Sequence, residues 1–406
     1  MSRRAPAIVV LATVVALLGG AVPRVAIGDH GGREIGALFT CDRPVSPPRC
    51  TSVGDGLTHF VAFDDSLTDG LADSLRQAML EAYDQPTKLT MVEQSSVTDE
   101  TDAIAFSDDY GENGAAAWVY CPIEAPQGIN PTGDRWCRAQ EIHFNLNPRY
   151  GNFFADDGSR DHVTCHELGH TLGLRHWGNP PASRGSEVGE TCMNANTPDG
   201  PTRLHQFDLD HINAYQYRTV PLPPSSNGPR TAPRILPWRG IVASTEVEPL
   251  PATLAEMISS ADAVVRGRIT AVVPGRVFGS RHDRPLHYAS AILEVDAVLA
   301  GALPPAHRSS LTLEIPLFDG PSSIGDLPVW GESVFLLRNK GTSAREVGLT
   351  PARIRAESGF YRLLTFTSLV VNEDGAALTA GDAGPLADLS GLPFEEALAT
   401  IRRAGR

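Results

Sequence analysis

The chain has 406 residues, of which 42% are apolar, and a formal net charge of −14. The length allows two or three domains with buried cores, and the apolar content excludes a wholly disordered chain. The negative charge argues against a nucleic-acid partner, because binding to phosphates needs a basic surface.

The first residues have the pattern of a secretory signal peptide. Two arginines precede an uncharged run from Ala5 to Pro23, and Gly19 and Ala21 fit a small-x-small cleavage site. We expect residues 1–26 to be removed on export, leaving a secreted or cell-surface-retained protein without stable membrane association. The alternative is an uncleaved anchor, since about 19 uncharged residues can just span a bilayer.

Six cysteines lie in the first half of the chain. An even number in an exported protein suggests disulfides, and the lack of any CxxC pair disfavours a cysteine zinc site. Pairing of neighbours closes the shortest loops, but the sequence leaves the pairing open. Residues 27–56 would form an N-terminal segment that carries the first pair. The candidates are Cys41, Cys50, Cys121, Cys137, Cys165 and Cys192.

The region 57–217 alternates predicted strands and helices. Such alternation indicates an α+β fold built on a mixed sheet. Hydrophobic periodicity places helices over about 69–82, from about Asp161 through a histidine-rich segment, and over 207–217, where Leu209 and Ile212 share one stripe. The expected strands are 57–63, 89–92, 103–106, 117–120 and 141–147.

The remaining chain has a different texture. Residues 218–240 are rich in Pro, Ser and Gly, which is typical of a semi-rigid linker. Residues 241–406 form a β-rich accessory domain that suggests a small all-β barrel of OB-like type, without a catalytic cluster. Its expected helices are 254–262 and 392–405, and its expected strands are 263–273, 289–299, 310–317, 332–339 and 363–371.

The segment CHELGHTLGLRHW at 165–177 has the spacing of a metal site. His166 and His170 are four residues apart, so both rings lie on one face of a helix and can bind one zinc ion. Glu167 lies about 100° around the helix, outside the first coordination shell but within reach of a water on the metal.

The third histidine of the segment needs a break in the helix. Ten further helical residues would carry His176 about 15 Å from His166 along the axis. Gly173 can take the left-handed conformation that ends helices, which lets the chain turn back. Three protein ligands leave a fourth position for water, and this predicts a catalytic rather than a structural zinc ion.

The segment HELGHTLGLRH resembles the zinc-binding signature of the metzincin metalloproteases, most closely the matrixin branch. The resemblance spans about residues 57–217, but only 166–176 and Met193 are specific. It implies that Met193 lies on a tight turn beneath the metal, that a helix closes the domain, and that residues 141–147 supply an edge strand for an extended peptide substrate. Matrixins are usually kept latent by a pro-domain cysteine; too few residues precede Cys50 for such a domain, so the latency mechanism stays open.

Three further expectations concern a cysteine pair, two histidines and two acidic clusters. Cys165 precedes the first ligand and Cys192 precedes Met193, so a bond between them would tie the catalytic helix to the methionine turn; two free thiols are the alternative. His143 is expected to pack or to lie on the surface rather than to bind the metal, and His162 is expected to start the helix. Two acidic clusters are either calcium sites or ordinary surface turns: Asp108, Asp109 and Glu112, then Asp156, Asp157 and Asp161, where Asp161 is also a candidate N-cap.

The sequence therefore predicts a secreted zinc metalloendopeptidase that hydrolyses protein or peptide substrates through a zinc-bound water activated by Glu167. One alternative is a metallohydrolase of a non-peptide amide. Another is an exported binding or adhesion protein in which the β-rich domain carries the function and the first domain is a scaffold. The oligomeric state and the natural substrate do not follow from the sequence.

Overall fold

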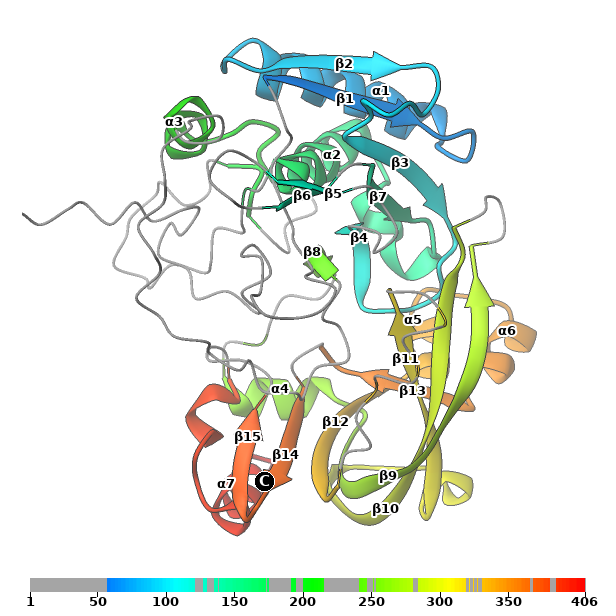
Figure 1. Cartoon of the computed structure of the whole chain (residues 1–406). Coiled ribbons are helices and arrows are strands. Elements are labelled where there is room, and N and C mark those ends of the chain that lie inside the picture. The colour runs from blue at the N-terminus through cyan, green and yellow to red at the C-terminus, as the bar shows by residue number, and fades with distance from the viewer. Residues whose placement is uncertain are drawn as a thin grey trace, which may run out of the picture.

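The computed structural model confirms the predicted mixed α+β class, with two mixed sheets and several helices (Figure 1). The described residues are 57–120, 127–129, 135–137, 139–172, 174, 191–194, 200–214, 241–246, 251, 253–279, 284–318, 321, 324, 327, 331–365, 368–379 and 385–405. The signal-peptide segment, the N-terminal disulfide segment and the predicted linker lie outside them.

The first sheet has six strands in the order β2-β1-β3-β7-β4-β8. β1, β2, β3 and β7 are parallel, whereas β4 is antiparallel to both of its neighbours. Parallel neighbours need a crossover connection, and α1 lies in the one from β1 to β2. The strands are β1 Thr58–Phe63, β2 Thr90–Gln94, β3 Ala103–Asp108, β4 Ala115–Tyr120, β7 Gln140–Asn145 and β8 Ile241–Glu246.

Two strands of this sheet differ from expectation. β7 pairs with β3 on one side and β4 on the other, so the expectation that residues 141–147 form an edge strand is wrong. β8 pairs with β4 of the first sheet, although residues 241–246 were expected to belong to the β-rich accessory domain. A separate two-stranded ribbon joins β5 (Gln127–Ile129) to β6 (Arg135–Cys137).

Helices pack on one face of the first sheet. α1 (Asp69–Gln77) buries Leu71 and Leu75 at helical spacing and continues as the π-helix η1 (Ala78–Asp84). α2 (Asp157–Thr171) follows the 3-10 helix η2 (Pro148–Phe153), and α3 is Gln206–Ala214. The buried residues shared by these helices and the sheet include Val61, Leu71, Leu75, Ala105, Ile142, Phe144, Val163, Leu168 and Ile212.

The second sheet has the order β13-β11-β10-β9-β12-β14-β15, and β13 also pairs with β12. These pairings join β9, β10, β11, β13 and β12 into a ring, in which only β11 and β13 are parallel. The strands are β9 Ala263–Phe278, β10 Leu286–Gly301, β11 Ser310–Leu317, β12 Ser333–Asn339, β13 Phe360–Leu363, β14 Leu369–Glu373 and β15 Ala376–Thr379.

One predicted strand of the second region is split. The run 363–371 contains a turn in which Ser368 N–H donates to the Thr365 carbonyl oxygen (3.1 Å) and Thr365 N–H donates to Ser368 Oγ (2.8 Å). This turn ends β13 and starts β14, so a single strand over 363–371 is wrong.

Short helices cover the second sheet. α4 begins with a capping box between Thr253 and Glu256, and α6 begins with Thr350 as N-cap followed by Pro351. α5 and α6 were not predicted from the sequence. Among the described residues, no helix combines the length and apolar character needed to cross a bilayer. The helices are α4 Leu254–Ser260, η4 Pro305–His307, α5 Lys340–Glu346, α6 Pro351–Glu357, η6 Ala387–Leu389 and α7 Phe394–Ala404.

The two regions share a core along β4. Successive side chains of a strand point to opposite faces, so Ala117 and Val119 pack with the helices while Trp118 packs with the second region. The Trp118 ring lies edge-on to Phe318, with ring centroids 5.3 Å apart. Tyr288 of β10 donates its hydroxyl to the Tyr110 carbonyl oxygen at 2.8 Å. The second region therefore fixes β4 from the face opposite the helices.

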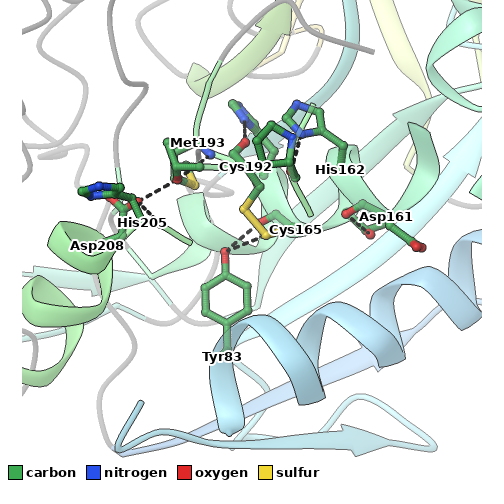
Figure 2. Close-up of a disulfide and its surroundings, with 12 residues drawn as sticks. Tyr83, Asp161, His162, Cys165, Cys192, Met193, His205 and Asp208 are labelled. Carbon is green, nitrogen blue, oxygen red and sulfur yellow. Dashed lines mark hydrogen bonds between the residues drawn. A yellow bond between two sulfur atoms is a disulfide. The ribbon is translucent and has the colours of Figure 1, made fainter. Parts of the chain in front are cut away.

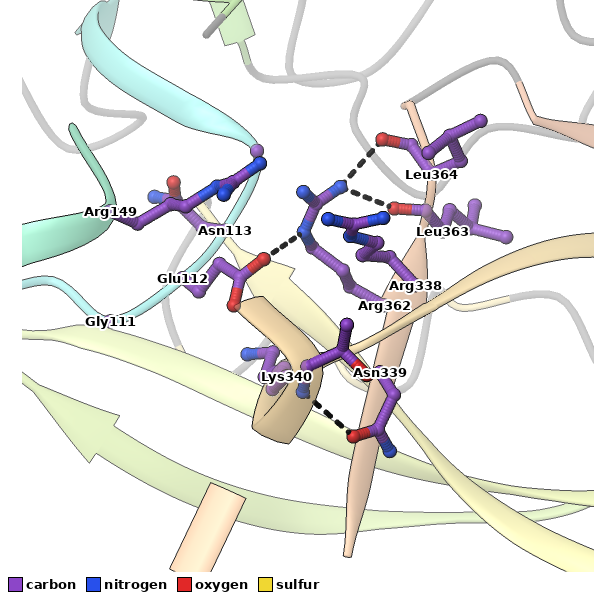
Figure 3. Close-up of polar contacts among 12 residues, drawn as sticks. Gly111, Glu112, Asn113, Arg149, Arg338, Asn339, Lys340, Arg362, Leu363 and Leu364 are labelled. Carbon is purple, nitrogen blue, oxygen red and sulfur yellow. Dashed lines mark hydrogen bonds and ion pairs between the residues drawn. The ribbon is translucent and has the colours of Figure 1, made fainter. Parts of the chain in front are cut away.

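A buried ion pair also joins the two regions (Figure 3). Arg362 of β13 donates from Nε to Glu112 Oε1 at 2.7 Å and from Nη1 to the carbonyl oxygens of Leu363 and Leu364. Burial disfavours the charged guanidinium, but the Glu112 carboxylate outweighs it, so the pKa of Arg362 lies above its ordinary value.

Candidate active site

Helix α2 carries the histidine motif and begins earlier than predicted. Asp156 is its N-cap and accepts a hydrogen bond from Ser159 N–H at 2.8 Å. The expectation that the helix begins near Asp161, with Asp161 as N-cap, is therefore wrong by about one turn. Every residue from His162 to Thr171 is buried, so the helical part of the motif lies inside the molecule.

His166 and His170 face each other, as their spacing predicts. Their Nε2 atoms are 2.9 Å apart, and the ring centroids are 4.6 Å apart with the planes nearly perpendicular. The other nitrogen of each ring contacts a backbone carbonyl: His166 Nδ1 lies 2.7 Å from the Cys192 oxygen, and His170 Nδ1 lies 2.8 Å from the Leu174 oxygen.

These contacts fix the tautomer of both rings. A carbonyl oxygen only accepts hydrogen bonds, so each Nδ1 must carry the proton. In a neutral imidazole the Nε2 atom then presents a lone pair, and two lone pairs 2.9 Å apart attract a cation. Both nitrogens lie within reach of one zinc ion, whose bonds to histidine are about 2.0–2.1 Å long. The donor set therefore fits zinc, with the second shell of carbonyl acceptors that ligating histidines use.

The turn after α2 redirects the chain before the third histidine. Leu174 N–H donates to the Gly169 carbonyl oxygen at 3.0 Å, the long-range bond of a Schellman ending. The helix ends at Thr171, two residues before Gly173. Gly173 and His176 lie outside the described residues, so the position of His176 relative to His166 and His170 stays a prediction. Within the described residues, no three His, Cys, Asp or Glu side chains converge as a metal-binding group.

Glu167 is fully buried on α2 between the two histidines of the motif. Its charge acts on Tyr83 of η1: burial, then the charges of Asp208 and Glu167, raises the pKa of the Tyr83 hydroxyl well above its ordinary value. Tyr83 is therefore a neutral donor, and its hydroxyl donates to the Cys165 carbonyl oxygen at 2.6 Å (Figure 2).

Met193 packs against the middle of α2. A Cβ atom added at Gly169 would overlap Met193 Sδ and come within 2.8 Å of Tyr83 Oη. Glycine at position 169 therefore lets the methionine turn and Tyr83 approach the helix backbone. No pattern in the sequence predicts the role of Tyr83, whereas the glycine inside a helix at position 169 is a signal for close backbone contact.

A disulfide joins Cys165 of α2 to Cys192, and their Cα atoms are 5.9 Å apart (Figure 2). This confirms the pairing expected from their positions beside His166 and Met193. Cys41, Cys50 and Cys121 lie outside the described residues, and only the backbone of Cys137 is described, so their pairing stays open.

Helix α3 holds the methionine turn from the other side. Asp208 Oδ2 accepts hydrogen bonds from the Thr191 hydroxyl at 2.7 Å and from His205 N–H at 3.2 Å. Thr191 Oγ1 in turn accepts from Met193 N–H at 3.2 Å. Asp208 and Thr191 are supporting residues that sequence reasoning missed, because nothing in either segment indicates that they meet.

Two other histidines, on α2 and β7, lie outside the motif. The expectation that His162 starts the helix is wrong. His162 is buried within α2, and its Nδ1 contacts the Pro201 carbonyl oxygen at 2.7 Å. His143 packs as expected, stacked between Phe106 and Trp118 with ring centroids 5.3 and 5.0 Å away.

The acidic clusters have protein partners. Glu112 pairs with Arg362, and Asp109 Oδ1 accepts from Asn147 Nδ2 at 2.8 Å. Asp156 caps α2, and Asp157 forms an ion pair with Arg160. Calcium binding at either cluster stays a prediction.

No protein-family model and no curated protein sequence matches the chain. The candidate site therefore depends on its own residues and geometry.

Proposed function

We propose that this chain is an exported zinc-dependent endopeptidase in which His166, His170 and His176 hold one zinc ion. The observation that carries the proposal is the pair of Nε2 atoms that face each other at 2.9 Å while both Nδ1 atoms contact carbonyl oxygens. Neutral rings in these tautomers leave two lone pairs directed at one point, which suits a divalent cation.

The proposed chemistry assigns one role to each group. A bound zinc ion would polarise the scissile carbonyl and lower the pKa of water. The Glu167 carboxylate would accept a proton from the attacking water and return it to the leaving amine. Burial of Glu167 and of both histidines keeps bulk water away, which strengthens each electrostatic contact.

The surrounding framework supports this assignment. The disulfide, the Thr191–Asp208 hydrogen bond and the close packing of Met193 on Gly169 converge on the segment that accepts the His166 hydrogen bond. Rigid support of this kind is what a site needs to hold ligands in productive geometry. As part of the same proposal, residues 57–217 form a metzincin-like peptidase domain that is most similar to the matrixin branch.

The accessory region is proposed to be an OB-like barrel. Its support is the ring of pairings that includes β11 parallel to β13 and β12 antiparallel to both β9 and β13. Its shared core with β4 makes it part of the peptidase framework rather than a freely hinged module. Secretion after removal of residues 1–26 completes the proposal, and N-terminal sequencing of the exported protein tests it.

The deciding experiment measures zinc content and casein cleavage on the same preparations. Wild type should bind one zinc ion and cut casein, and a chelator should abolish cutting. Glu167→Gln should keep the metal while losing about 10²–10⁴-fold in rate, whereas His176→Ala should lose the metal. Asp161→Asn, on the same helix, is the matched control and should behave like wild type.

Other outcomes separate the alternatives. Stoichiometric zinc without cleavage of any peptide would favour a hydrolase of a non-peptide amide. A wild-type chain that binds no zinc would favour the binding-protein alternative and overturn the peptidase proposal.

A further inference from the structure

Strand β8 occupies the outer side of β4, at the end of the first sheet (Figure 1). Its Cα partners are Ala115 with Glu246, Ala117 with Thr245, Trp118 with Ser244, Val119 with Ala243, and Tyr120 with Ile241. β8 also lies against α2, the helix that carries His166 and Glu167. An extended segment of the chain thus runs antiparallel along β4, a strand that also lies against α2.

Sheet edges recognise extended peptides by strand addition, in which main-chain hydrogen bonds supply the affinity. Only one chain can pair with a given edge at a time. Given the peptidase function proposed above, we infer that β8 is a self-inhibitory strand: it covers the β4 edge that an extended substrate needs, and substrate must displace it.

The ladder between β4 and β8 is interrupted. Register shifts lie between Ala115 and Ala117 and between Val119 and Tyr120, so only three consecutive pairs are regular. Bulges of this kind leave residues unpaired and weaken the local ladder. A peptide that pairs along β4 without such interruptions has more main-chain hydrogen bonds and can compete with β8.

β4 itself is fixed, so displacement affects β8 alone. Ala117 and Val119 are buried in the core shared with the helices, and Trp118 is buried in the core shared with the second region. β7 pairs with β4 on its other side. The edge therefore stays formed when β8 leaves.

The position of β8 in the sequence keeps it close to this edge. Residues 247–253 link it to α4 of the second region, which is itself packed on β4. A short tether gives an effective concentration on the order of millimolar, so a weak ladder is sufficient to cover the edge. If β8 is paired nine-tenths of the time, the apparent affinity for a competing peptide falls about tenfold. This pairing would lower the activity of the enzyme until a substrate displaces β8.

The test compares zinc-loaded full-length proteins on a fluorogenic casein-derived peptide. Ala243→Pro with Ser244→Pro places proline at two adjacent positions, one of whose N–H groups must face β4 in an antiparallel ladder. We expect kcat/KM to rise about tenfold, mainly through KM. Ser225→Pro with Ser226→Pro, in the preceding proline-rich segment, is the matched control and should leave kcat/KM unchanged.

A second variant keeps the inference falsifiable if the proline pair perturbs folding. Ala117→Cys with Thr245→Cys places two thiols on Cα partners, so oxidation should lock β8 on β4 and mild reduction should release it. We expect kcat/KM to fall at least tenfold on locking and to recover on reduction, with each single-cysteine variant unaffected.

The outcomes separate this inference from the proposed function. Equal kcat/KM for wild type, the proline pair and the locked protein would overturn the self-inhibitory role while leaving the peptidase function intact. Absence of cleavage by every protein, with zinc bound, would overturn the peptidase function and the inference with it.

Discussion

His166 contacts the carbonyl oxygen of Cys192 through its Nδ1 at 2.7 Å, while Cys192 is bonded through sulfur to Cys165, the residue directly before His166. The hydrogen bond and the disulfide therefore connect α2 to the methionine turn at two adjacent positions. Together they fix the His166 ring, which is proposed to bind zinc: rotation of the imidazole would break the hydrogen bond, and the disulfide prevents the turn from moving away.

Removal of this disulfide should cost stability as well as metal affinity. Cys165→Ser opens a loop with a sequence separation of 27 residues. The chain-entropy model gives a loss of about 3–4 kcal/mol in the free energy of unfolding for such a loop. Guanidinium denaturation followed by fluorescence measures the loss, and competition with a zinc chelator measures the affinity.

The matched comparison is the double variant Cys165→Ser, Cys192→Ser. The bond is already absent in the single variant, so the second substitution should add little. If the double variant instead lost clearly more unfolding free energy than Cys165→Ser, the two cysteines would act independently and no bond would be present in solution.

Local patterns predicted the parts of the site that are close in sequence. Four-residue spacing brings His166 and His170 together because both lie on one helix face, and the positions of the cysteines directly before His166 and Met193 predicted the Cys165–Cys192 bond. The expected end of the helix near Gly173 agrees with the end at Thr171.

Contacts between distant segments were not predictable in this way. Tyr83 meets Cys165 across 82 residues and Asp208 meets Thr191 across 17, and no periodicity or motif joins those segments. The expectation that residues 141–147 form an edge strand is wrong for the same reason. Alternation of apolar and polar residues indicates a strand, but tertiary packing decides the order of the strands in the sheet. The sequence does not decide where α2 starts, because Asp156 and Asp161 are equally good N-caps in isolation.

Gly169→Ala should destabilise the protein even though alanine is the better helix former. The substitution gains about 1 kcal/mol in helix propensity, but the new methyl group overlaps Met193 Sδ. Overpacking of this kind costs about 1–3 kcal/mol, so we expect a net loss of unfolding free energy and weaker zinc binding. Urea denaturation and zinc competition are the measurements.

Met193→Ala provides the paired control for Gly169→Ala. It removes the side chain that lies nearest to the new methyl group, so the cost of Gly169→Ala should shrink in this background. Some cost should remain, because the added Cβ still comes within 2.8 Å of Tyr83 Oη. An unchanged cost in both backgrounds would show that Met193 does not pack on Gly169 in solution.

His59 should make the first region sensitive to acid. Burial lowers the pKa of the His59 imidazole to about 3. Because the folded pKa is below the unfolded value of about 6.5, the unfolded state binds the proton more readily. Stability is therefore complete above pH 6.5 and falls as the pH is lowered towards 3, by about 1.4 kcal/mol per pH unit.

His59→Gln tests this dependence, because glutamine can still donate to Thr171 Oγ1, which lies 3.0 Å from His59 Nε2. Between pH 7 and pH 5 the variant should gain about 2 kcal/mol relative to wild type. Thr171→Val removes the hydrogen bond but keeps the buried imidazole, so it should retain the wild-type slope. Parallel stability curves for wild type and His59→Gln would contradict the assignment.

Removal of one partner of the Arg362–Glu112 ion pair should destabilise the junction of the two regions much more than removal of both partners. Both side chains are buried, with 6% and 8% exposure. Arg362→Met leaves the Glu112 carboxylate buried without its cation, which costs about 3–5 kcal/mol, whereas the double variant Arg362→Met, Glu112→Leu removes both charges and should recover most of the loss.

Arg353→Met is the matched control, since Arg353 contacts Glu357 and is 43% exposed; its loss of unfolding free energy should be about 0–1 kcal/mol. Guanidinium unfolding followed by the fluorescence of Trp118, which lies at the junction, reports the loss there. If the double variant were no more stable than Arg362→Met, the cost would come from lost packing and backbone hydrogen bonds rather than from an unpaired charge.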